Sequence, residues 1–153
     1  MRIDPFLRQS PIFQTSRAAR RMEASLNLVL KEEELTFFES LVLAAIFFEK
    51  KGTIKPSHLA ETFQTTRGNV SHCISSLEAK GLVRRRIDAD DARALQLVLL
   101  PVGRKRAARV VGILDRMQRH VEETVGIAKL ESMLAQMNAV EELCARLAQS
   151  TRG

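Results

Sequence analysis

Apolar residues recur at spacings of three and four along most of this chain, which is the period of an α-helix that buries one face. Local sequence signals mark where these helical segments begin and end. Thr36 with Glu39 forms a capping box that starts one helix. Gly52, Gly81 and Gly126 stand where a helical pattern stops. Together these signals predict helices at about residues 12–30, 36–50, 56–63, 66–80, 101–125 and 127–148.

A different pattern occupies the centre of the chain. Residues 82–87 and 94–100 carry Val, Leu and Ile on either side of the acidic run 88–93, which predicts two strands and their turn. The turn lacks Asn-Gly and Asp-Gly, so we expect a longer loop. Thr53 and Ile54 suffice only for a small edge strand. The two helices before the hairpin are separated by a short polar break, as in a helix-turn-helix.

A helix-turn-helix followed by a basic hairpin is a winged helix. We therefore expect a mainly α (α+β) fold, with an arm and a helix over 1–34, a winged helix-turn-helix over 35–100 and further helices over 101–153. The flanking helices carry more apolar surface than a domain of about 70 residues needs to cover itself. They form either one larger monomer core or a contact with a second copy.

Composition narrows the class of protein. The chain has 153 residues, of which 45% are hydrophobic and 27% are charged, and this fits one globular domain with helical extensions. No apolar run approaches the roughly 18 residues of a membrane span, and the N-terminus lacks the apolar region of a signal peptide. Two cysteines far apart make no disulfide framework. We therefore expect a soluble, cytoplasmic protein.

The net charge of +6 is distributed unevenly. Residues 65–106 hold nine basic and four acidic side chains, and residues 1–31 hold six and two. Residues 32–64 are net acidic and residues 107–153 are neutral. The excess therefore lies on the predicted helix-turn-helix, the hairpin and the N-terminal arm, which favours a nucleic-acid partner, although a basic run alone is equally typical of a solvated face.

The helix predicted at 66–80 carries polar and basic side chains off its apolar stripe. The major groove of DNA admits one α-helix and presents a distinct pattern of donors and acceptors. Arg67 fits guanine, Asn69 fits adenine, and the helix N-terminus at Thr66 can bind a phosphate. The serines among the candidates also fit ordinary exposed positions. The candidate DNA-contacting residues of this helix are Thr66, Arg67, Asn69, Ser71, His72 and Ser75.

The hairpin offers a second set of contacts. Arginine is favoured in the minor groove, where the negative potential is strongest. Arg93, near the hairpin tip, is the first candidate for that contact. Arg85 and Arg86 should point to opposite faces of their strand, so one can face DNA while the other supports the hairpin.

At this point the sequence resembles the MarR family of winged-helix transcriptional regulators. The resemblance covers about residues 35–106 closely and the flanking helices in layout. Its most specific part runs from Leu77 through Arg93, although Ala92 stands where the family often has a second arginine. The residues that carry the resemblance are Leu59-Ala60, Val70-Ser71-His72, Leu77 to Val83, Arg85 with Asp91-Ala92-Arg93, and Leu99 to Gly103.

The resemblance implies a function. It predicts a homodimer in which 1–34 and 101–153 supply the dimerisation helices. This dimer would bind double-stranded DNA at a pseudo-palindromic operator, with half-sites about one helical turn apart. Repression by blocking polymerase is the commoner mode in this family. The resemblance also implies that Asp91 orients Arg93 or Arg85 through a charge-assisted hydrogen bond.

Small aromatic or phenolic effectors often bind between the dimer helices and the winged-helix lobe in this family. Here Phe37, Phe38, Phe47 and Phe48 either line such a cleft or belong to the core. Cys73 and Cys144 lie on apolar stripes, so we expect small buried hydrophobes rather than redox sensors.

Two rival functions remain. An enzyme is disfavoured because the three histidines lack metal-ligand spacing and there is no GxSxG, P-loop or GxGxxG, so we expect no catalytic, cofactor or metal site. The other rival is a winged helix that serves as a protein-interaction module without DNA binding. A DNA-binding assay with salt titration separates these alternatives.

Overall fold

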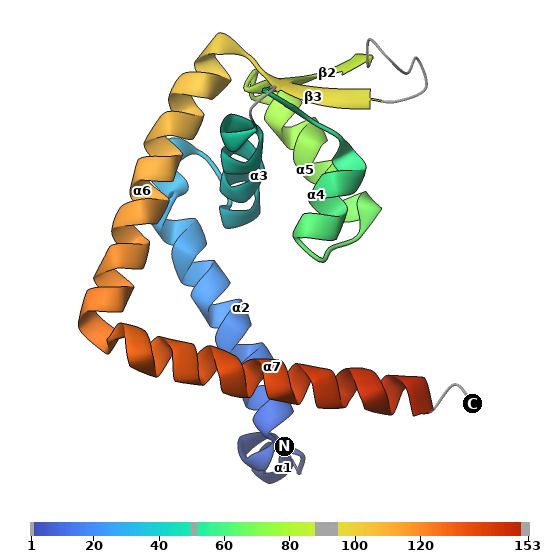
Figure 1. The fold of residues 1–153 in the computed structure, drawn as a ribbon, viewed down its shortest axis with the longest axis vertical. Coiled ribbons are helices and arrows are strands. Elements are labelled where there is room, and N and C mark those ends of the chain that lie inside the picture. Colours follow the sequence, from blue (N-terminus) through green and yellow to red (C-terminus); the bar gives the residue numbers. More distant parts are fainter. Residues whose placement is uncertain (1, 50–51, 88–94, 151–153) are drawn as a thin grey trace. The chain divides into compact units, whose positions relative to one another are not determined.

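Helices dominate the computed structural model, which describes residues 2–49, 52–87 and 95–150 (Figure 1). Contacts divide the chain into two compact units, Met1–Val111 and Gly112–Gly153. The predicted mainly α winged helix-turn-helix is confirmed. Its elements are α1 (Asp4–Gln9), α2 (Pro11–Val29), the 3₁₀ turn η1 (Lys31–Glu33), α3 (Phe37–Phe48), β1 (Thr53–Ile54), α4 (Pro56–Thr62), α5 (Arg67–Ala79), β2 (Val83–Ile87), β3 (Leu95–Leu99), α6 (Pro101–Val125) and α7 (Ile127–Ser150).

Local signals set most of the helix ends. Thr36 and Glu39 make both bonds of the predicted capping box, at 3.1 Å from the Glu39 amide to Thr36 Oγ1 and 2.8 Å from the Thr36 amide to the carboxylate. Gly52, Gly81 and Gly126 have φ of 64°, 68° and 95°, in the left-handed region that favours glycine. Gly81 and Gly126 therefore act as the predicted stops, whereas Gly52 lies beyond the end of α3, whose C-cap is Glu49.

The wing is a three-stranded antiparallel sheet in the order β1-β3-β2. In the β2–β3 pair Val83 faces Leu99 and Ile87 faces Leu95. The short strand β1 adds the predicted edge, where Thr53 faces Val98. The turn between β2 and β3, which contains Asp91 and Arg93, lies outside the described residues.

The core of the first unit lies where α3, α4 and α5 pack beneath the sheet and against the start of α6 (Figure 1). The beginning of α6 approaches the backbone very closely. A Cβ atom on Gly103 would lie only 1.8 Å from the carbonyl oxygen of Leu82, so only glycine fits there. The largest fully buried side chains are Leu30, Leu43, Ile46, Leu59, Ile74, Leu77, Leu82, Leu97, Val42, Val70, Val83 and Val110.

The structure adds detail at three places. Helix α1 was not predicted, because its six residues are too short to show a period. The acidic segment before α3 is the turn η1, which closes at Glu34 with a φ of 56°. Helix α3 ends at Phe48, slightly before the predicted position near residue 50.

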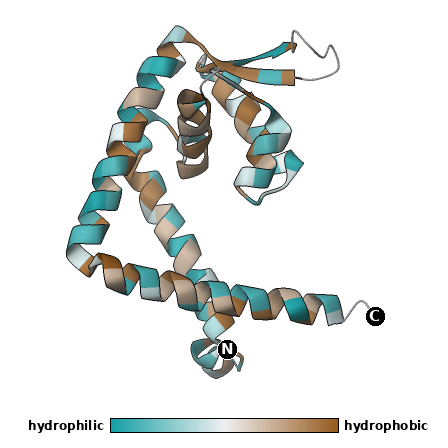
Figure 2. Cartoon of the chain, in the orientation of Figure 1, coloured by the Kyte–Doolittle hydropathy of each residue, from teal (hydrophilic) through white to brown (hydrophobic). Residues whose placement is uncertain are grey.

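Helices α2 and α7 are among those that present apolar side chains to solvent, and both carry brown segments in Figure 2. In the first unit, α2 exposes Met22, Leu28 and Val29. In the second unit, α7 has no buried residue at all. No described helix combines the length and apolarity that crossing a membrane requires. The exposed apolar residues of α7 are Ile127, Met133, Leu134, Met137, Val140, Leu143 and Leu147.

Candidate nucleic-acid interface

Helix α5 buries one face and exposes the other. Thr66 caps it, accepting a 3.1 Å hydrogen bond from the Asn69 amide through its hydroxyl. Val70, Cys73, Ile74 and Leu77 point into the core. All six candidate residues predicted on this helix are exposed, so the structure brings them together on one surface: Thr66, Arg67, Asn69, Ser71, His72 and Ser75.

Successive residues of an α-helix are rotated by about 100°, so His72, Ser75 and Gly68 lie opposite the buried stripe. Arg67 and Asn69 flank them near the N-terminus. The Asn69 side chain donates a 3.0 Å bond to the Thr65 hydroxyl. A bidentate contact with adenine uses both heteroatoms of an amide, so Asn69 would exchange this bond on binding.

The wing arginines behave differently from one another. The Arg85 amide donates to Glu78 Oε1 at 3.0 Å, and its guanidinium forms an ion pair with the same carboxylate. It also reaches the Ser75 hydroxyl at 3.3 Å. Arg84 and Arg86 point to the opposite face of β2 and are exposed. Arg85 therefore connects the base of the wing to the end of α5. The sequence pattern did not indicate its partner Glu78.

A second polar contact, which we call the Glu39 anchor, joins Glu39 of α3 to Ser76 and Lys80 at the other end of α5. Ser76 donates to Glu39 Oε1 at 2.5 Å. Lys80 Nζ lies 3.0 and 2.8 Å from the two carboxylate oxygens, and it also donates to the Glu34 carbonyl at 2.8 Å. The sequence pattern indicated only the capping role of Glu39 and did not point to its contacts with Ser76 and Lys80.

Glu39 is ionised in this setting. Burial by itself raises the pKa of its carboxyl. The hydrogen bonds from Lys80, Ser76 and the Thr36 amide together lower this pKa by more than burial raises it. The net effect is a pKa below the ordinary value of 4.5. The Glu39 anchor is therefore a charged contact at neutral pH.

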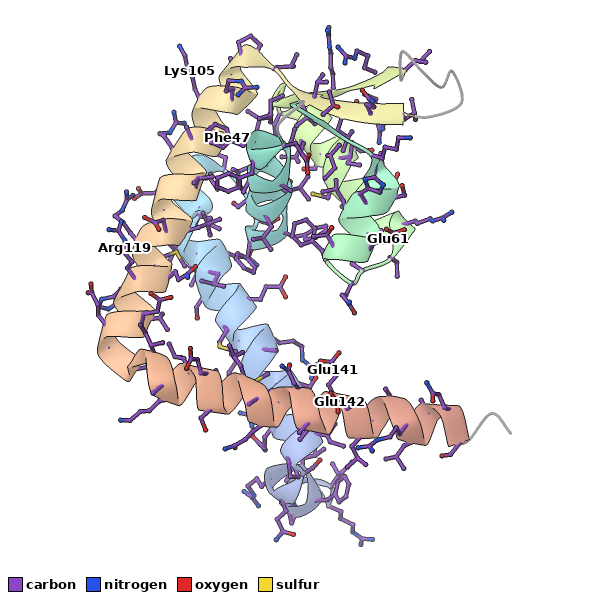
Figure 3. All side chains as sticks on the ribbon, viewed as in Figure 1. Phe47, Glu61, Lys105, Arg119, Glu141 and Glu142 are labelled. Atoms are coloured by element: carbon purple, nitrogen blue, oxygen red, sulfur yellow. The ribbon has the colours of Figure 1, made fainter. Side chains whose placement is uncertain are left out.

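The basic run that opens α6 is largely engaged in the fold. Arg106 and Arg109 both pair with Glu33, at 3.3 and 3.0 Å. Arg104 lies over the Phe47 ring at 6.0 Å from its centroid, and Lys105 points outward (Figure 3). Arg104 and Arg106 of the run 104–106 thus have partners within the fold.

A cavity of about 650 Å³ opens beside α5. Its lining includes Phe63 together with Phe37 and Phe38, two of the four phenylalanines that were predicted either to line an effector cleft or to belong to the core. Phe38 and Phe63 make an edge-to-face contact at 5.6 Å. Phe47 and Phe48 instead contact each other at the other end of α3. His72 and Lys80 supply polar groups to the same cavity.

The two cysteines differ in environment. Cys73 is buried, and this burial, with the nearby Glu39 charge, raises the pKa of its thiol to about 12 despite the opposing effect of Lys80. Cys144 is half-buried on α7. Within the described ranges, no three His, Cys, Asp or Glu side chains gather in a way that could hold a metal ion.

Comparison with known proteins supports the assignment of the fold. The MarR family model matches residues 48–95. The HTH-type transcriptional regulator PrsX of Escherichia coli is 28% identical over 87 residues, which cover 57% of this chain and 52% of PrsX. The match thus spans about half the length of that relative.

Solved structures extend the similarity to most of the chain. The Staphylococcus aureus MepR–DNA complex aligns with a TM-score of 0.78 at 20% identity, over 88% of this chain and 98% of MepR. The Mycobacterium tuberculosis regulator MosR, also solved with DNA, gives 0.70 at 25% identity over 89% and 98%. BldR from Sulfolobus solfataricus gives 0.67 at 24% over 93% and 98%. The sequence match over residues 48–95 and the shared winged helix-turn-helix fold make this chain similar to the regulators of the MarR family.

Proposed function

We propose that this protein is a transcriptional regulator that binds double-stranded DNA sequence-specifically as a homodimer. The observation that carries the proposal is the capped helix α5, with six exposed polar or basic residues over a fully buried apolar stripe. The solved DNA complexes of MepR and MosR and the regulator PrsX support it.

Within this proposal α5 enters the major groove. Arg67 and Asn69 contact base edges, and Thr66 places the helix N-terminus against a phosphate. Ser71, His72 and Ser75 add polar contacts to bases or phosphates. Gly68 sits among them, and a Cβ there would meet nothing closer than 3.9 Å. Internal packing does not require this glycine, so it is best explained by close approach of a duplex to the helix backbone.

The wing contacts the flanking minor groove. Arg93 enters the groove, oriented by Asp91, and Arg86 faces the DNA backbone. Arg85 supports the wing through Glu78 and Ser75 at the edge of the same surface.

The exposed apolar residues of α2 and α7 support the homodimer. In this interpretation 1–34 and 101–153 supply the dimerisation helices and 35–100 binds DNA, so that two copies of α5 meet the halves of a pseudo-palindromic operator. Occupation of the operator blocks polymerase in the cytoplasm. The cavity beside α5, lined by Phe37, Phe38 and Phe63, supports release by a small aromatic or phenolic effector.

The test starts from a random-sequence duplex library, because the operator is unknown. Wild-type protein should enrich one duplex sequence, and the logarithm of its affinity should fall linearly with log salt, with a slope on the order of −5 to −9 for roughly 6–10 neutralised phosphates. Arg93→Ala should weaken binding by about 1–3 kcal/mol without unfolding the protein. A protein that enriches no duplex, or a flat salt dependence, would point instead to a winged helix that contacts other proteins.

A further inference from the structure

Glu39 does more than start a helix. A capping box needs only one carboxylate oxygen at the N3 position, and Oε2 of Glu39 meets that need through the Thr36 amide. The side chain is nevertheless only 5% exposed, and both oxygens accept hydrogen bonds from Ser76 or Lys80 of another helix. Burying a charge is costly unless it is paired, so the Glu39 anchor requires an explanation beyond capping.

The partners of Glu39 lie on a particular ridge of α5. Ser76 and Lys80 are one helical turn apart, and the same ridge continues through His72 to Asn69. The half of this ridge near the C-terminus is held by Glu39, whereas the half near the N-terminus is exposed among the proposed DNA contacts. One contact thus fixes the ridge that carries two of the proposed reading side chains.

Apolar packing and hydrogen bonding constrain a helix in different ways. The buried stripe of α5 holds the helix against the core, but apolar attraction is non-directional. Hydrogen bonds are directional and tolerate only a few tenths of an ångström. A rotation of α5 by about 20° around its axis would move side-chain tips by roughly 2 Å, enough to lose a base contact.

We propose that Glu39 is a positioning residue for DNA recognition, which sets the rotation of α5 around its axis through Ser76 and Lys80. The inference rests on the proposed DNA-binding function. Lys80 strengthens the effect because it also bonds to the Glu34 carbonyl, so the C-terminal end of α5 is tied to two points just before and within α3.

The test compares specific with non-specific binding. A duplex enriched by the wild-type protein and a scrambled duplex of equal length are titrated with wild type, Glu39→Gln and Ser76→Ala. Glutamine keeps the capping box but removes the charge that holds Lys80. Glu39→Gln should lower the ratio of the two affinities by about tenfold, the size of one lost base contact, and leave the salt slope unchanged. Ser76→Ala should lower the ratio in the same direction by a smaller factor.

Glu33→Gln is the matched control, because Glu33 is a paired glutamate in the same corner but bonds to α6 rather than α5. It should lower the melting temperature without lowering the affinity ratio. If Glu39→Gln fails to fold, Ser76→Ala decides. A ratio within twofold of wild type in the folded variants would overturn the proposal and leave Glu39 a purely structural residue. If the wild type itself selects no duplex, the proposed function fails and this inference falls with it.

Discussion

Helices α5 and α7 carry apolar stripes of the same spacing, but the stripe of α5 is buried and that of α7 is exposed. In α5 the exposed fractions of Val70 and Leu77 are 1% and 0%. In α7 those of Met137 and Leu147 are 40% and 57%. The comparison teaches that a helical period shows which face seeks burial, but not whether the same chain supplies the partner. We expect α5 to depend on the fold of one chain and α7 on a second copy.

The largest effect should come from the buried stripe. Leu77→Ala removes a fully buried side chain, so the free energy of unfolding should fall by about 3 kcal/mol. The exposed counterpart Leu147→Ala should change the unfolding of the winged-helix part by less than about 0.5 kcal/mol. Urea unfolding followed by circular dichroism measures both. If both variants lost the same free energy of unfolding, the proposed difference between the two stripes would be wrong.

A charge on the exposed stripe should act on assembly instead of folding. Met137→Glu places a carboxylate on the apolar face of α7, and its burial between two copies should raise the dimer dissociation constant by more than about tenfold. Ala139→Glu, on the opposite face of the same helix, is the control and should leave the dimer intact. Light scattering at micromolar concentration gives the mass. A wild-type monomer would contradict the expected homodimer.

The Glu39 anchor of α5 should make the stability of the fold depend on pH. The pKa of Glu39 is lower in the folded protein than its ordinary value of 4.5, so the unfolded chain takes up the proton first. The stabilisation is complete above about pH 4.5 and disappears as the pH falls through the lower folded value. Urea midpoints between pH 3 and 7 should therefore fall less steeply for Glu39→Gln than for wild type. Parallel curves would show that the carboxylate contributes nothing.

The smallest expected effect is a difference in labelling between the two cysteines, of which Cys73 lies on the stripe of α5 and Cys144 on that of α7. Cys73 is buried and its pKa is raised to about 12, so little reactive thiolate forms at neutral pH. Iodoacetamide should label the half-buried Cys144 in the native protein and Cys73 only after denaturation, as mass spectrometry of peptides would show. Labelling of both at one rate would mean that α5 opens as readily as α7.

Much of the fold could be predicted because its signals are local. The Thr66 cap and the stop at Gly81 act within one turn of the residues they bound, and these positions in the structure agree with the pattern. The exposed face of α5 follows from the same period. The candidate surface was therefore predictable as a set, although its individual contacts with DNA remain predictions.

Contacts between elements were harder to predict from the sequence. Glu78 reaches Arg85 only because the turn at Gly81 folds β2 back along the end of α5. Glu39 already had a sufficient local explanation in its capping box, so nothing in the pattern pointed to Ser76 and Lys80. Such pairs depend on the angle at which helices pack, and the spacing of residues along one helix does not determine that angle.

The close approach at Gly103 has a mechanical consequence. At this point α6 meets Leu82 backbone to backbone, and the Leu100 amide donates to the Leu82 carbonyl at 3.0 Å. A joint without side chains has no rotamers that could absorb a displacement. A tilt of the first turn of α6 would therefore displace Leu82, which lies between α5 and the wing, by a similar amount. The joint is a stiff linkage, and the carbonyl of Leu82 leaves no room at residue 103 for any side chain larger than that of glycine.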